Sequence, residues 1–303
     1  MKDVKSMITN KNKFASIELE KNFDLAYEDE VFKKIVSRLK LPKDKLIKYT
    51  SLIEDSSCEI RNCEKCKNIM ECKNTVTGYV YYPEVEQENI VFSYLPCKYK
   101  KKLDKDNAYK SNVLLFDMPK EILEATMKNI YTDDKNRLEP IKWITTFIKK
   151  YELGEETRGL YLTGNFGCGK TYLVAAAFNE LAKRGKKTVI VYYPEFLRTL
   201  KERFSDDFRD VFNKVKKAEV LLLDDIGAET TTNWNRDEIL GTILQYRMQE
   251  KLPTFFTSNL TIEELEEHLA GSDNEGKIKA RRIIERIKYL TDNVTMVAEN
   301  RRK

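Results

Sequence analysis

A glycine-rich loop ending in Lys-Thr constrains this chain more than any other feature. Residues 164–171 read Gly-Asn-Phe-Gly-Cys-Gly-Lys-Thr and match the phosphate-binding pattern Gly-x4-Gly-Lys-Ser/Thr. The glycines allow backbone N–H groups to surround phosphate oxygens, Lys170 brings a positive charge to the β- and γ-phosphates, and the Thr171 hydroxyl can ligate Mg²⁺. The residues expected to contact the nucleotide here are Gly164, Asn165, Phe166, Gly167, Cys168, Gly169, Lys170, Thr171 and Tyr172.

The flanking sequence supports a nucleotide site. Residues 158–162 are typical of a short buried strand that leads into the loop, and apolar residues recur at helical spacing after it until Gly185. A helix N-terminus offers unpaired N–H donors and a favourable dipole to an anion. The alternative is a glycine-rich turn that happens to carry Lys-Thr. We expect a nucleoside triphosphate, ATP, with Mg²⁺.

Polar side chains end two later strands. Val220–Leu223 is a continuous apolar run followed by Asp224 and Asp225, as expected for a strand buried on both faces of a parallel sheet. Asp224 is predicted to hold Mg²⁺, and Asp225 to orient or deprotonate the attacking water. Asn259 follows the strand 254–258, where it can sense the γ-phosphate. Both Asp-Asp and Asn also occur in ordinary turns, which is the alternative reading.

The alternation of these elements predicts an α/β fold, a doubly wound, mostly parallel sheet with helices on both faces. A chain of 303 residues can hold two domains, each with its own core. We expect a small, mostly helical, cysteine-bearing domain over residues 1–102. A linker and lead-in helix over 103–136 and the nucleotide-binding domain over 137–303 complete the predicted organisation.

Five of the six cysteines precede the nucleotide motifs. Cys63 and Cys66 have the spacing that lets two thiolates chelate one ion, and Cys72 and Cys97 can complete a tetrahedral Zn²⁺ site. Cys58 is a spare that can replace Cys72, and free thiols are the alternative. The sequence contains one histidine, His268, far from this group, so histidine ligation is not expected.

Charge and hydropathy limit the kinds of partner and the cellular location that are expected for this chain. The net charge is +5 with 34% charged residues, which permits contact with nucleic acid without demanding it. The N-terminus has no apolar stretch typical of a secretory signal, and no run approaches the length of a membrane span. We expect a cytoplasmic protein with no membrane partner.

Taken together, these motifs resemble the bacterial DnaI-type primosomal proteins, loaders of the replicative helicase. The resemblance spans nearly the whole chain. It includes the cysteine-bearing N-terminal region, the phosphate loop, Leu-Asp-Asp-Ile-Gly-Ala-Glu at 223–229, Leu-Pro-Thr-Phe-Phe-Thr-Ser-Asn-Leu at 252–260, and Arg286. The phosphate loop and paired aspartates alone are generic to many ATPases, whereas their combination with the 252–260 segment and Arg286 is more specific.

The resemblance implies an AAA+ ATPase whose N-terminal zinc domain grips the hexameric replicative DNA helicase and whose ATPase domain responds to ATP and single-stranded DNA. Lys170 and Thr171 then form the Walker A pair, Asp224 and Asp225 the Walker B pair, and Asn259 the first sensor. Arg286 resembles the arginine finger, which acts on ATP held by a neighbouring subunit, so self-association is implied. The alternative for Arg286 is one more charge on a basic helix.

Several points depart from that family pattern or leave it open. Many AAA+ ATPases have Glu where Asp225 stands, which suggests slow turnover. Little chain follows Asn259, so a helical lid with a second sensor has little room. The basic residues between Pro194 and Ala218 can neutralise DNA phosphates, but the aromatic residues beside them have core spacing. Those basic residues are Arg198, Lys201, Arg203, Arg209, Lys214, Lys216 and Lys217.

Other functions use the same nucleotide motifs. The main alternative is a transposition-helper AAA+ ATPase acting on DNA, against which the cysteine-rich region argues. A small-molecule kinase does not explain the cysteines, and an origin-binding initiator needs a further DNA-binding domain. An adaptor that binds ATP without hydrolysing it is the remaining class.

Overall fold

The computed structural model describes residues 17–87, 89–202, 206–271 and 274–301, with the side chains of 206–208 excepted. The chain divides into two compact units, Met1–Asn107 and Ala108–Lys303. Each unit has its own hydrophobic core. Among the described residues, no helix combines the length and the apolar character needed to cross a bilayer.

The N-terminal unit packs short helices against a hairpin. Asp29 caps its first labelled helix by accepting hydrogen bonds from the backbone N–H groups of Val31 and Phe32. Phe32 and Ile53 are fully buried between the helices, and Ile90 of the hairpin joins this core. The elements are α2 (Glu30–Leu39), α3 (Lys43–Leu46), η1 (Ile47–Tyr49), α4 (Thr50–Lys65), η2 (Ile69–Glu71), β1 (Tyr79–Glu86), β2 (Asn89–Pro96) and α5 (Lys98–Asn107).

The segment 103–136, predicted as a linker and lead-in helix, differs in the structure. Helix α5 continues to Asn107, and β3 (Val113–Phe116) pairs in parallel with a strand of the central sheet. A four-residue edge strand is too short to show a periodic pattern, which is why the sequence did not reveal it. Short 3-10 turns follow: η4 (Lys120–Glu124), η5 (Met127–Asn129) and η6 (Lys135–Arg137).

A parallel sheet forms the centre of the C-terminal unit. Its strand order is β3-β5-β6-β7-β4-β8, and every neighbouring pair is parallel. The fold confirms the predicted α/β class with its doubly wound sheet. The five strands beyond β3 are β4 (Gly159–Thr163), β5 (Thr188–Tyr192), β6 (Val220–Asp224), β7 (Thr254–Ser258) and β8 (Thr291–Thr295).

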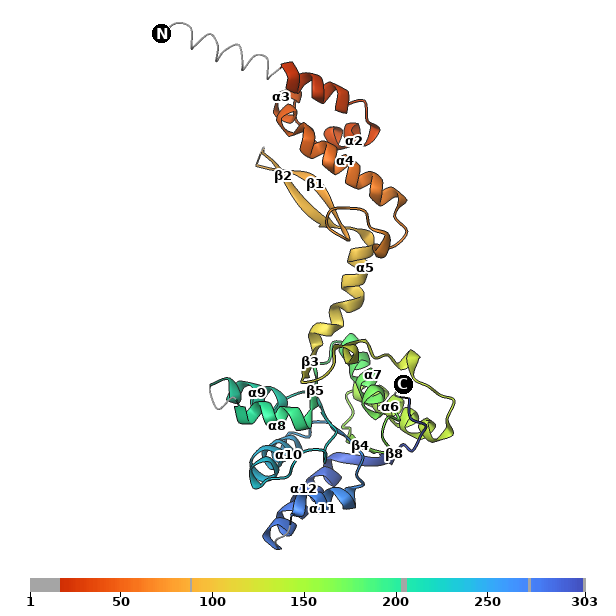
Figure 1. Ribbon diagram of the computed structural model, residues 1–303, viewed down its shortest axis with the longest axis vertical. Helices are drawn as coiled ribbons and strands as arrows, with labels where there is room; N and C mark the ends of the chain where they lie inside the picture. The colour runs from red at the N-terminus through yellow and green to blue at the C-terminus, as the bar shows by residue number, and fades with distance from the viewer. Residues whose placement is uncertain (1–16, 88, 203–205, 272–273, 302–303) are drawn as a thin grey trace. The chain divides into compact units, whose positions relative to one another are not determined.

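Helices cover both faces of this sheet (Figure 1). Alternate residues of each strand point to opposite faces, so Leu222 of β6 joins one core and Leu223 the other. The core of Leu222 is closed by α6 (Leu138–Glu152) and α7 (Lys170–Lys183). The core of Leu223 is closed by α8 (Tyr193–Glu202), α9 (Asp206–Lys216), the π-helix η7 (Trp234–Leu240), α10 (Gly241–Gln249), α11 (Ile262–Ala270) and α12 (Asn274–Leu290).

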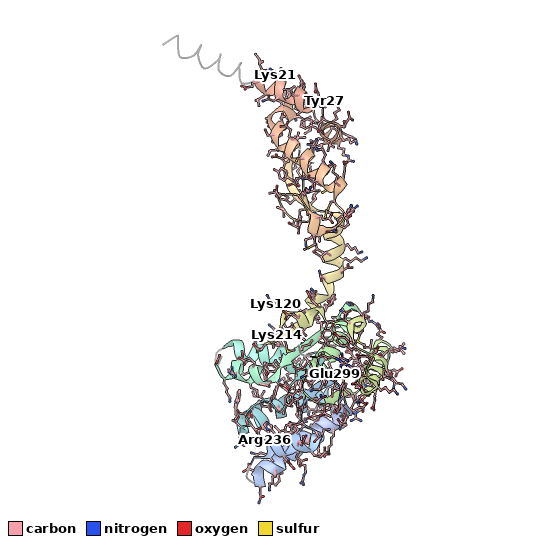
Figure 2. All side chains as sticks on the ribbon, turned by 45° about the vertical axis from the view of Figure 1, so that its right-hand side comes forward. Lys21, Tyr27, Lys120, Lys214, Arg236 and Glu299 are labelled. Carbon is pink, nitrogen blue, oxygen red and sulfur yellow. The ribbon has the colours of Figure 1, made fainter. Side chains whose placement is uncertain are left out.

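Close packing around β4 positions the phosphate loop. A Cβ atom at Gly159 would lie 1.8 Å from the carbonyl oxygen of Thr254 on β7, so only glycine fits there. On the other side of β4, the unpredicted strand β8 pairs with it along its whole length. Strand β4 is therefore held between two neighbours, and the loop that follows it starts from a fixed point. Figure 2 shows the side chains of both units and labels Lys214 on α9 and Arg236 on η7.

Candidate nucleotide site

A cavity of about 860 Å³ opens at the carboxyl ends of the strands in the C-terminal unit. In an open parallel sheet this edge is where ligands bind. The predicted residues Lys170, Thr171, Asp224, Asp225 and Asn259 all line this cavity. Other lining residues come from the segment before α6 and from the C-terminal segment, among them Met118, Pro119, Ile130, Tyr131, Arg137 and Arg301.

The phosphate loop depends on glycine at the points where neighbouring groups come close. A Cβ atom at Gly164 would lie 2.0 Å from the carbonyl oxygen of Met296. Gly169 has a φ of +91° and is the N-cap of α7, so a side chain there would be strained as well as crowded. Helix α7 therefore starts directly at the loop, and its first backbone N–H groups lack partners within the helix. Such a terminus binds anions.

Lys170 is held at the centre of the loop. Its Nζ donates to the carbonyl oxygens of Gly164 at 2.9 Å and Asn165 at 3.0 Å, and to Oδ1 of Asn259 at 2.7 Å. The residue is 8% exposed. The ammonium group is thus fixed between the loop and the tip of β7, where a phosphate chain in the cavity would meet it.

Asp224 and Asp225 lie at the end of β6, opposite the loop, and Thr257 of β7 joins them. The Thr257 hydroxyl donates to Oδ1 of Asp224 at 2.6 Å and accepts from the backbone N–H of Asp225 at 3.0 Å. The Asn259 amide donates to Oδ1 of Asp225 at 3.4 Å. Thr257 was not predicted as a site residue. It lies two residues before Asn259, however, and therefore near the same edge of the sheet.

Burial raises the pKa of Asp224 to about 6. Hydrogen bonds from Thr257 and Thr171 oppose this shift, the charge of Asp225 adds to it, and Lys170 opposes it. The Thr171 hydroxyl and the Asp224 carboxylate are therefore close together. Hard oxygen ligands of this kind suit Mg²⁺, so these two residues fit the predicted magnesium site.

Asp225 adopts a left-handed backbone conformation with φ of +59°. Most side chains are strained there, whereas Asp and Asn tolerate it because their short polar side chains can hydrogen-bond locally. This conformation gives a physical reason for a shorter carboxylate at a position where many AAA+ ATPases have Glu.

The raised pKa of Asp224 predicts a pH-dependent stability in Mg²⁺-free buffer. The pKa of Asp224 in the folded protein lies above the ordinary value of 3.8 for an aspartate, so ionisation of Asp224 costs stability. That cost is absent below about pH 4, grows between about pH 4 and 6, and is complete above it. Asp224→Asn mimics the protonated form, so we expect it to be more stable than wild type by about 1–2 kcal/mol at pH 7.5.

Denaturant unfolding with EDTA at pH 4, 5, 6 and 7.5 measures this difference. The gap between Asp224→Asn and wild type should shrink as the pH falls through the window. A gap that stays constant across the series would contradict a raised pKa at Asp224.

The C-terminal segment, residues 296–301, forms hydrogen bonds with the phosphate loop. The sequence did not predict this contact. The Asn165 side chain donates to the carbonyl of Ala298 at 2.8 Å and accepts from its N–H at 3.1 Å. The Cys168 thiol is buried and donates to the carbonyl of Met296 at 3.3 Å, and the N–H of Arg301 donates to the carbonyl of Gly167 at 2.9 Å. The side chains of Asn165 and Cys168 are therefore bonded to the protein's own backbone.

Three further predicted residues lie in different surroundings. The Phe166 side chain is 68% exposed and lines the cavity, and the Tyr172 hydroxyl accepts a hydrogen bond from the N–H of Thr126. Arg286 is not among the residues that line the cavity. It lies on α12, where its Nη1 donates to the carbonyl of Gly241 at 3.1 Å, and burial lowers its pKa.

The cysteines predicted to bind zinc lie at the end of α4, directly after η2 and directly before α5 in the N-terminal unit. N–H groups donate to three of their sulfurs: Asn74 Nδ2 to Cys63, Gly78 N to Cys72 and Lys100 N to Cys97. Among the described residues, however, no group of three or more His, Cys, Asp or Glu side chains is placed to hold a metal ion. The Cys66 thiol donates to the carbonyl of Asn68 at 3.0 Å. The structure does not support the zinc site, which stays a prediction from spacing.

The basic residues of α8 and α9 lie beside aromatic rings that pack against the hydrophobic core. Phe196 is fully buried, and Phe212 packs against the same core. The ammonium of Lys216 lies 5.4 Å from the ring of Phe212 and 5.3 Å from that of Tyr246. Arg203 lies outside the described residues. These rings are partly or fully covered, which limits their use as stacking surfaces for bases.

The fold and the site define a P-loop ATPase of the AAA+ type. A family model described as AFG1-like ATPase matches residues 95–298. The replicative helicase loader DnaI of Bacillus subtilis (strain 168) is 40% identical over 266 residues, which cover 87% of this chain and 84% of the relative. A crystal structure of DnaI aligns with a TM-score of 0.58 at 45% identity and covers 64% of this chain and 99% of that one. The replicative helicase loader DnaC of Escherichia coli (strain K12) is 29% identical over 34% of this chain and 43% of its own.

The chain therefore belongs to the DnaI family of ATPases.

Proposed function

We propose that this chain is an ATP-dependent loader of a hexameric replicative DNA helicase, acting in the cytoplasm during primosome assembly. The observation that carries the proposal is the extent of the match to the B. subtilis replicative helicase loader, which includes the N-terminal unit as well as the ATPase unit. A generic P-loop module would match over the C-terminal unit alone. The relatives named above do not include a transposition helper.

In this proposal the nucleotide lies across the carboxyl edge of the sheet. Backbone N–H groups of the loop and the Lys170 ammonium bind its phosphates, and Thr171 with Asp224 holds Mg²⁺, which neutralises phosphate charge when bound. Asp225 accepts a proton from the attacking water, and the Asn259 amide, bonded to both Lys170 and Asp225, fixes their relative positions. We infer that turnover is slow because Asp225 is short.

Two features of the proposal act between molecules. Arg286 lies away from the cavity of its own chain, which suits a cation supplied to a neighbouring subunit's ATP. Single-stranded DNA would follow the basic residues of α8 and α9 by charge, with little stacking. If Arg286 acts in this way, self-association raises the ATPase rate. If the basic residues bind single-stranded DNA, DNA raises it. An ATPase rate per chain that is independent of protein concentration and of single-stranded DNA would contradict them.

We also propose that the N-terminal unit binds one Zn²⁺ through Cys63, Cys66, Cys72 and Cys97, on the strength of their spacing in the sequence. Protein purified without chelators should contain about one zinc per chain by atomic emission. Cys72→Ser should lower this content, whereas Cys58→Ser, at an exposed position, should not. Freshly purified wild type without zinc would refute the site.

The test of the loader function is a binding experiment with the full chain. The protein is mixed with the replicative helicase of its host, with ATP, with ADP and without nucleotide, and the mass of any complex is measured by light scattering. We expect a complex whose stability depends on the nucleotide. If no complex forms under any condition, the loader function fails while the ATPase assignment stands.

A further inference from the structure

One buried cation beside the phosphate loop has no role in the site described above. Arg137 ends the 3-10 turn η6 immediately before α6, and it is 4% exposed. It lines the nucleotide cavity, and its Nη2 lies 2.9 Å from the position that a Cβ atom of Gly169 would take. Within the described part of the chain, its Nε and Nη1 have no hydrogen-bond partner.

A buried guanidinium in this condition is costly. Charged groups away from water are normally paired and hydrogen-bonded, and unpaired ones destabilise the fold. The charge of Arg137 acts on the Asp133 carboxylate, but Asp133 is exposed and its side chain bonds to Arg301 at 2.6 Å. The ring of Tyr131 lies 5.9 Å from the Arg137 Cζ and offers no hydrogen-bond acceptor in its plane of contact. Neither supplies the acceptors that Arg137 lacks.

Two other arginines described above, one that lines the cavity and one that lies away from it, differ from Arg137. Arg301 also lines the cavity, but its guanidinium bonds to Asp133 and stacks on Tyr131 at 4.7 Å. Arg286 bonds to Gly241 on α10. Arg137 is thus a cation next to the loop, among the residues that line the cavity, with two buried donors that lack a partner.

We propose that Arg137 binds the phosphate chain of the nucleotide as a second cation, in cis with Lys170. The inference rests on the proposed nucleotide site. A guanidinium has only donors and is always charged, so its ligand must be an acceptor, and an anionic one compensates its burial best. Phosphate oxygens in the cavity beside Gly169 and Lys170 are such acceptors. The charge of a triphosphate also exceeds what one Mg²⁺ and one lysine neutralise.

The test separates ligand binding from a structural role. In Arg137→Met the buried charge is removed while most of the side-chain volume is kept. Affinities for MgATP, MgADP and adenosine are measured by calorimetry, and thermal stability is measured without nucleotide. We expect MgATP to bind about 10- to 100-fold more weakly, the size of a charge-assisted hydrogen bond, and adenosine to bind as before. The melting temperature without nucleotide should stay the same or rise, because an unpaired buried charge is gone.

A matched control is Arg184→Met, which removes a surface guanidinium paired with Glu152 and Glu180 away from the cavity, and which should bind MgATP as wild type does. Unchanged MgATP affinity in Arg137→Met overturns the proposal. So does a weaker MgATP affinity that comes with a lower melting temperature, since that indicates a structural role. Equal losses for adenosine and MgATP place the contact on the base or ribose and overturn the phosphate assignment. If wild type binds no nucleotide, the proposed nucleotide site itself is wrong.

Discussion

Lys170→Met is expected to weaken MgATP binding by more than about 100-fold and to abolish measurable ATP hydrolysis. Lys170 is the cation at the centre of the loop, and each charge-assisted hydrogen bond it makes to a phosphate contributes about 1.5–3 kcal/mol. Methionine keeps the length of the side chain, but it cannot donate to phosphate oxygens. The loss therefore reports the missing charge and its hydrogen bonds.

The same substitution tests how Lys170 is held. The carbonyls of Gly164 and Asn165 and the Asn259 amide oxygen lose the hydrogen bonds that the ammonium donates. A modest fall in melting temperature is expected, with a cooperative transition retained. Lys183→Met is the matched control, because Lys183 lies on the same helix α7 and pairs only weakly with Glu180, at 3.9 Å. Wild-type affinity in Lys170→Met, measured by calorimetry, would show that the phosphates bind elsewhere.

Asp225→Asn should reduce the hydrolysis rate by about 100- to 10,000-fold while MgATP affinity stays within about threefold of wild type. Asparagine cannot accept the proton of the attacking water. It does tolerate the left-handed conformation of residue 225, and its Oδ1 can still accept the hydrogen bond from Asn259. Hydrolysis is therefore lost without disturbance of the site.

Two comparisons sharpen this prediction. Asp225→Ala should lose hydrolysis to the same degree. Its free energy of unfolding should be lower by about 1 kcal/mol, because the left-handed backbone conformation is strained for alanine. Asp210→Asn, at an exposed position of α9, should hydrolyse ATP at the wild-type rate. Single-turnover ATPase assays give the rates. Full activity in Asp225→Asn would remove Asp225 from the chemistry.

The residues that line the cavity could be found in the sequence because they belong to short motifs at strand ends. The parallel sheet then brings Lys170, Asp224 and Asn259 to one edge, as the order of strands and helices required. The apolar run 220–223 indicated a strand with both faces covered, and the two cores on either side of β6 confirm this.

The features that the sequence did not reveal are those without a local sequence pattern. Strand β3 is four residues long, and β8 reads Thr-Asp-Asn-Val-Thr, with too few apolar residues to stand out. The contact between residues 296–301 and the phosphate loop consists largely of hydrogen bonds to backbone carbonyls, which no residue pattern encodes. Arg137 and Thr257 belong to no recognisable motif, and only the fold places them at the cavity. The cysteine spacing suggested a metal centre that the described contacts do not assemble.

Calorimetric titration of the wild-type chain with ATP, with and without Mg²⁺, tests the central claim most directly. A triphosphate between the loop amides and the Asp224–Thr171 pair predicts saturable uptake of about one ATP per chain, at least about tenfold tighter with Mg²⁺ than with EDTA. No heat of binding in a folded sample, or the same affinity with and without Mg²⁺, would contradict it.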